Sequence, residues 1–139
     1  MRHAMLCLLL MLCSVFTFSQ EQPQWKVVQS VVLRGQTAPI PQTTLFTPQE
    51  PGLYRFSGYV SGTAHNQAGL AFGLTCTDET GFQGCGVSMG AGYLQPWESI
   101  GAYVFSPRPG TPVYYFTEFD NPPPQSPKYT LVFTIEQLQ

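Results

Sequence analysis

The feature that most constrains this fold is an alternating segment that follows a proline–glycine turn. Pro51 fixes φ and Gly52 is free to adopt positive φ, so the two together predict a reversal of the chain. After the turn, Tyr54, Phe56 and Val60 fall on one side of an extended chain, and mostly polar side chains fall on the other. This period of two predicts a β-strand with one buried face.

The same alternation recurs along the chain and predicts eight strands. Their expected ranges are residues 25–33, 42–46, 53–61, 70–76, 84–94, 98–105, 113–119 and 129–136. Prolines at positions 39, 41 and 48 place the second strand at a sheet edge, where a missing N–H is tolerated. Regular spacing without a helical stripe or an internal repeat predicts an all-β fold, either an antiparallel two-sheet sandwich or a closed barrel.

The N-terminus predicts a secretory signal peptide at residues 1–19. Arg2 supplies the positive region, residues 4–18 the apolar core, and Ser19 a small residue for cleavage. An uncleaved membrane anchor is the alternative, but the apolar run is shorter than the ~20 residues that a spanning helix needs. We therefore expect a single domain at residues 20–139, secreted or periplasmic, without a membrane association after cleavage.

The cysteines left after cleavage predict a disulfide. Cys76 and Cys85 are an even pair in an oxidising compartment, and the short segment between them is typical of a hairpin connection. A metal site is the alternative, but two thiols without a nearby histidine give only half of a ligand set.

The low charge of the chain limits the kinds of partner that it is expected to bind. Charged residues make up 10% of the chain, and the lysines and arginines beyond the signal peptide are scattered singly. A nucleic-acid ligand needs a basic surface that neutralises phosphates, so we expect no nucleic-acid binding.

The segment Phe46-Thr-Pro-Gln-Glu-Pro-Gly-Leu-Tyr-Arg-Phe-Ser-Gly-Tyr-Val60 also resembles a known family. It is similar to the "F…PGxYxFxxxV" strand of the jelly-roll head domains in the complement first component and the tumour necrosis factor superfamily. The resemblance implies an all-β, antiparallel two-sheet jelly-roll-like sandwich. It further implies homotrimers and ligand recognition rather than catalysis.

Groups able to perform catalysis are few. His65 is the single histidine beyond the signal peptide and falls in a polar turn, where a solvated side chain is expected. Ser88 fits the letters of a Gly-x-Ser-x-Gly motif, but that motif works between a strand and a helix, and no helix is predicted. A glycosidase needs two carboxylates at a set separation. The available ones are Glu98, Glu118, Asp120 and Glu136, which the sequence does not pair. No catalytic residue and no cofactor are therefore predicted.

Calcium is an alternative on two acidic turns. Asp78 with Glu79, or Asp120 with Asn121, offers oxygen ligands. Neither pair follows the spaced pattern of a calcium loop, so no metal site is predicted.

Aromatic side chains are the candidates for ligand binding. Large rings that project outward from a sandwich form a platform for sugars or a protein partner, although core packing is the common use of such residues. The candidates are Trp97, Tyr93, Tyr103 and Tyr114, and Tyr59 is a further one. The main hypothesis is a non-catalytic binding or assembly module that recognises a protein through exposed loops, including the proline loop at residues 121–127. A carbohydrate-binding module is the alternative, and a small secreted hydrolase is a third.

Overall fold

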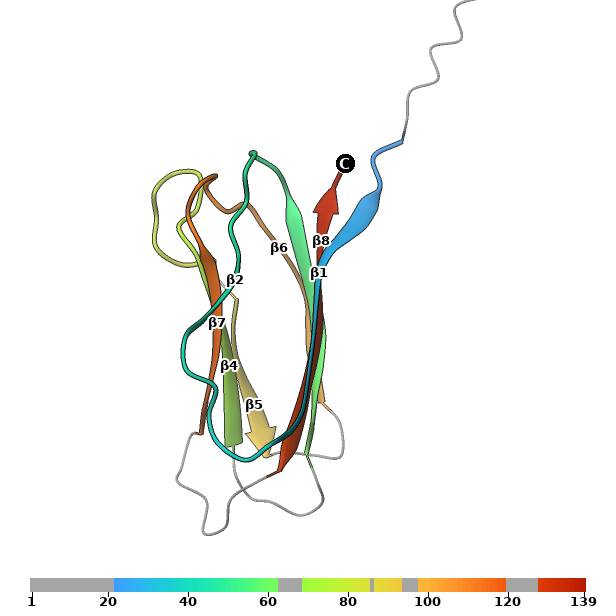
Figure 1. Cartoon of the computed structure of the whole chain (residues 1–139), viewed down its shortest axis with the longest axis vertical. Helices are drawn as coiled ribbons and strands as arrows, with labels where there is room; N and C mark the ends of the chain where they lie inside the picture. Colours follow the sequence, from blue (N-terminus) through green and yellow to red (C-terminus); the bar gives the residue numbers. More distant parts are fainter. Residues whose placement is uncertain (1–21, 63–68, 86, 94–97, 120–127) are drawn as a thin grey trace, which may run out of the picture.

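The computed structural model describes residues 22–62, 69–85, 87–93, 98–119 and 128–139, which form a two-layer sandwich (Figure 1). The strands are β1 (Trp25–Gln36), β2 (Thr43–Phe46), β3 (Tyr54–Gly62), β4 (Gly69–Thr75), β5 (Val87–Tyr93), β6 (Glu98–Phe105), β7 (Val113–Phe119) and β8 (Tyr129–Leu138). All eight predicted strands are present, and β6 and β7 have the predicted bounds. The predicted all-β fold class is confirmed.

The strand order is that of a jelly roll. The first sheet has the order β1-β8-β3-β6 and the second sheet the order β2-β7-β4-β5, with all neighbours antiparallel. The pairs β1–β8, β2–β7, β3–β6 and β4–β5 describe one long hairpin that is wrapped across both sheets. The short β2 lies at the edge of its sheet, as the flanking prolines predict.

The core lies between the sheets and is rich in aromatic rings. From β3, the side chains of Tyr54, Phe56 and Val60 are buried, so the predicted inward face is confirmed. Phe56 stacks on Phe72 of the second sheet with ring centroids 5.1 Å apart, and Phe133 contacts both rings. These rings join the two layers, because each sheet contributes to the same cluster.

A bulge changes the predicted alternation of β6. The register with β3 shifts between Ser99 and Gly101, where Gly101 adopts a φ of 88° that favours glycine. As a result Ile100 and Phe105 are both buried, although they differ by an odd number of positions. Strict alternation over residues 98–105 would predict that Ile100 and Val104 share one side, and this is wrong, since Ile100 is buried and Val104 is 57% exposed.

The predicted signal peptide, residues 1–19, lies outside the described residues. Across the described ranges, no helix is long and apolar enough to span a membrane.

Candidate functional site

A cleft lies on the outer side of the second sheet, next to the loop that joins β4 to β5. Its volume is about 490 Å³, within the range of about 300–1,000 Å³ that ligand pockets occupy. The side chains that give it its chemistry are Gln42, Thr75, Thr77, Gln83, Thr111 and Tyr114. We call this hollow the Tyr114 cleft.

The floor of the Tyr114 cleft comes from two paired strands. Thr75 of β4 lies opposite Tyr114 of β7 in the ladder, so both side chains project to the same side. Val113 and Tyr115, the neighbours of Tyr114, are buried in the core. Strand alternation therefore directs the Tyr114 ring outward, into the cleft.

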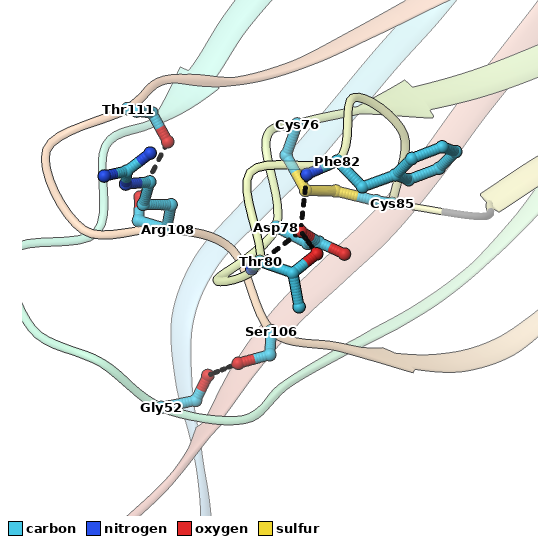
Figure 2. Close-up of a disulfide and its surroundings, with 9 residues drawn as sticks. All are labelled: Gly52, Cys76, Asp78, Thr80, Phe82, Cys85, Ser106, Arg108 and Thr111. Atoms are coloured by element: carbon cyan, nitrogen blue, oxygen red, sulfur yellow. Dashed lines mark hydrogen bonds between the residues drawn. A yellow bond between two sulfur atoms is a disulfide. The ribbon is translucent and has the colours of Figure 1, made fainter.

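One wall of the cleft is the β4–β5 loop, which projects outward from the second sheet at the top of Figure 1. The predicted disulfide between Cys76 and Cys85 is present, with the two Cα atoms 5.3 Å apart (Figure 2). Beside it, the Gly84 N–H donates to the Cys76 carbonyl at 2.8 Å, and Thr77 pairs with Gln83 across the loop. The loop is a small braced hairpin, so Thr77 and Gln83 are held in place before any ligand arrives.

The tip of this loop is organised by the carboxylate of Asp78. Its Oδ1 accepts hydrogen bonds from the Thr80 hydroxyl at 2.7 Å, the Phe82 N–H at 2.8 Å and the Thr80 N–H at 2.9 Å (Figure 2). The hydrogen bond from the Thr80 side chain is the main cause that lowers the pKa of Asp78, and the backbone donors act in the same direction. Gly81 completes the turn with a φ of 90°. The carboxylate of Asp78 therefore stabilises the turn. The described residues contain no group of three His, Cys, Asp or Glu that could hold a metal.

The loop is also docked on the connection between β6 and β7. The Arg108 N–H donates to the Thr77 carbonyl at 2.8 Å, and the Ser106 hydroxyl donates to the Glu79 carboxylate at 2.6 Å. Thr111, which lines the cleft, donates its hydroxyl to the Arg108 carbonyl at 2.7 Å (Figure 2). Two walls of the cleft are thus tied to each other.

The chemistry of the Tyr114 cleft is polar but uncharged. None of the described residues that line it carries a charge. Gln42 and Gln83 each offer an amide that both donates and accepts, and the three threonines offer hydroxyls that do the same. Tyr114 adds an aromatic face. Such a lining suits a neutral ligand that carries hydroxyl groups and apolar C–H faces.

Three of the predicted aromatic residues can be placed from their side chains: Tyr114 lies on the second sheet, and Tyr59 and Tyr103 lie on the first. Tyr114 lines the cleft, whereas Tyr103 lies on β6 of the first sheet and packs against the core. The two rings therefore do not share one platform. The side chain of Tyr93 and the whole of Trp97 lie outside the described residues, as do His65, Asp120 and the proline segment 122–124.

The candidate catalytic groups are not brought together where they can be placed. Glu118 is exposed on the outer side of the second sheet, while Glu136 on the first sheet forms an ion pair with Arg55 at 2.7 Å. These two carboxylates lie on opposite faces of the sandwich, so they do not flank a common bond. The side chains of Glu98 and Ser88 lie outside the described residues.

Sequence reasoning missed the two glutamines of the cleft. Gln42 and Gln83 lie in connections between strands, where a polar residue is unremarkable on its own. Only the jelly-roll pairing, which brings β2, β7 and β4 side by side, places them around Tyr114.

Comparisons with known proteins found a structural similarity but no sequence match. No protein-family model matches the chain, and no curated protein sequence matches it. Among solved structures, the chain is similar to the CBM22-1 xylan-binding domain of Xyn10C from Paenibacillus barcinonensis. The identity is 17% and the TM-score 0.46, over 85% of this chain and 81% of that one.

Proposed function

We propose that the protein is a carbohydrate-binding module that holds a neutral glycan in the Tyr114 cleft. The observation that carries the proposal is the lining of the cleft, which combines amides, hydroxyls and one aromatic ring with no charged side chain among the described residues. A sugar ring offers the complementary groups, since its hydroxyls donate and accept and its C–H faces pack on an aromatic ring.

Rigidity of the cleft supports the same proposal. The disulfide, the Asp78 turn and the Arg108–Thr77 hydrogen bond hold the walls without a ligand. A preformed site binds with a smaller entropic cost, because fewer side chains and loops are ordered on association. The disulfide also agrees with the extracytoplasmic location that the signal peptide predicts, where glycans are accessible.

Protein recognition through loops was the main hypothesis from the sequence, and the geometry favours the glycan alternative over it. The proline segment 122–124, on which that hypothesis partly rested, lies outside the described residues. Homotrimer formation stays a prediction, which light scattering of the purified domain tests.

Affinity electrophoresis through gels that contain soluble polysaccharides tests the proposal. Xylan, β-glucan, glucomannan and galactan represent neutral glycans, and polygalacturonate represents an acidic one. We expect at least one neutral glycan to retard the wild type and Tyr114→Ala to weaken binding by about tenfold, as the loss of one aromatic contact of about 1–1.5 kcal/mol implies.

Tyr59→Ala is the matched control, because Tyr59 is also a tyrosine that projects outward from its strand but belongs to the first sheet. It should bind as the wild type does. The proposal fails if no neutral glycan retards the wild type, or if the two tyrosine variants behave alike.

A further inference from the structure

We infer that the Tyr114 cleft is one end of a longer groove that binds a linear glycan over several consecutive sugar rings. The inference rests on the proposed function and adds the shape of its ligand. A second hollow, of about 390 Å³, lies further along the same side of the second sheet. Gln42 lines both hollows, so they meet at this residue.

Strand β7 runs along the floor of both hollows. The first is lined by Pro112 and Tyr114, and the second by Phe116 and Glu118. These are alternate positions, which project to the same side of a strand. At about 3.3 Å per residue, the stretch from Pro112 to Glu118 extends over about 20 Å. That length accommodates a row of sugar rings rather than one.

The second hollow also has an aromatic floor. Phe116 lies opposite Gly73 in the ladder, and a Cβ atom on Gly73 would lie 2.2 Å from Cζ of the phenyl ring. The ring therefore lies over the glycine, in space that any side chain would fill. Tyr114 and Phe116 are two residues apart, about 7 Å along the strand, so two rings stand in line to pack against successive sugars.

The far wall of the second hollow is fixed by buried hydrogen bonds. The connection from β1 to β2 contributes Pro39 and Pro41 to this wall. Between them, Ile40 exchanges two hydrogen bonds with Thr117 of β7: its N–H donates to the Thr117 hydroxyl at 2.7 Å, and its carbonyl accepts from the Thr117 N–H at 2.9 Å. Thr117 is only 2% exposed, so these bonds are shielded from water. The groove thus keeps its shape along its length.

The ligand class follows from these groups. Amides and hydroxyls at one end, two aromatic residues along the floor and no cation among the described lining residues match a neutral, linear polysaccharide. The exposed carboxylate of Glu118 at the other end repels uronic acids.

Isothermal titration with oligosaccharides tests the groove. The ligands are the cello-, xylo-, manno- and laminari-oligosaccharide series, each from dimer to hexamer. We expect the wild type to bind the hexamer of its preferred series at least tenfold more tightly than the dimer. Phe116→Ala should remove most of this gain while it leaves dimer binding within about twofold. Phe82→Ala, a matched control at a 67% exposed phenylalanine outside both hollows, should keep the gain.

Gly73→Ala provides a second test, because its methyl group has to displace the Phe116 ring while all groups of the Tyr114 cleft are retained. It too should reduce the hexamer gain and spare the dimer. Equal affinity for dimer and hexamer in the wild type, or equal losses on both ligands in Phe116→Ala, would overturn the groove. A wild type that binds no member of any series would instead overturn the proposed function itself.

Discussion

Removing one buried hydroxyl should measure how firmly the groove wall is attached to the core. Tyr129 is 1% exposed, and its hydroxyl donates to the Ala38 carbonyl at 2.9 Å. Because that proton is used, the Thr117 hydroxyl, 2.9 Å away, donates to the Tyr129 oxygen. Ile40, Thr117, Tyr129 and Ala38 are thus linked in one directed chain of hydrogen bonds. Burial raises the pKa of Tyr129 above its ordinary value of 10.0, so the phenol remains a donor at neutral pH.

Tyr129→Phe keeps the ring and deletes the oxygen. The Thr117 hydroxyl then loses its acceptor in a site that water does not reach, which costs about 1–3 kcal/mol. The freed Ala38 carbonyl belongs to an exposed residue and regains water, so it adds little. We expect the free energy of unfolding to fall by about 1–3 kcal/mol, which is a substantial part of the stability of a domain this size.

Urea denaturation followed by tryptophan fluorescence measures this change, provided that the m-value stays constant. Tyr59→Phe is the control, because Tyr59 is 42% exposed, so the loss of its hydroxyl should alter stability by less than about 0.5 kcal/mol. Equal unfolding midpoints for the two variants would refute the directed chain. A loss above about 4 kcal/mol would also refute it, since that size requires the ring to repack.

Two further predictions concern the core and the loop. Phe56→Ala should lower the free energy of unfolding by about 3–5 kcal/mol in thermal or urea unfolding, because Phe56 is fully buried between the sheets. The control, Val104→Ala on the outer side, should lower it by less than about 0.5 kcal/mol. A small loss for Phe56→Ala would contradict the central position of Phe56. The pKa of Asp78 in the folded protein is below its ordinary value of 3.8. The contribution of Asp78 to folding stability is therefore present above pH 3.8 and is lost as the pH falls through the folded pKa. Unfolding midpoints between pH 5 and 2 should therefore decline more steeply in the wild type than in Asp78→Asn. Parallel curves would contradict the claim that the ionised carboxylate of Asp78 stabilises the turn.

The fold could be predicted from the sequence because its signals are local. Alternation at Tyr54, Phe56 and Val60 reports a buried face within a few residues, and Pro or Gly marks where each strand ends. The disulfide followed from the two cysteines left after the signal peptide. The pattern failed at β6, where the bulge at Gly101 inverts the alternation, because a bulge depends on the partner strand as well as on its own residues.

The site could be predicted only in part, because it depends on contacts between distant segments. Tyr114 was a candidate as an outward aromatic residue, and its alternation in β7 was enough for that. Gln42, Gln83 and Thr77 come from two other connections, and no spacing within the sequence links them to Tyr114. Gly73 is the clearest case, since its role is visible only when the Phe116 ring is seen to occupy the space of its missing side chain.

The two outer sides of the sandwich differ in a way that explains why the groove lies on the second sheet. A hollow of about 420 Å³ also lies on the first sheet, near Ser57, Tyr59 and Thr134, but every described residue that lines it belongs to a strand. Among the described residues, a ligand there touches a sheet on one side, and no connection between strands forms a wall. On the second sheet, residues 39–42 and the β4–β5 loop stand beside β7 and supply walls as well as a floor. Because an uncharged glycan gains little from long-range electrostatics, its affinity depends on such enclosure and on the number of short contacts. Tyr114 thus differs from Tyr59 because it lies between walls, not because its ring is more exposed. This is why Tyr114→Ala should weaken glycan binding and Tyr59→Ala should not.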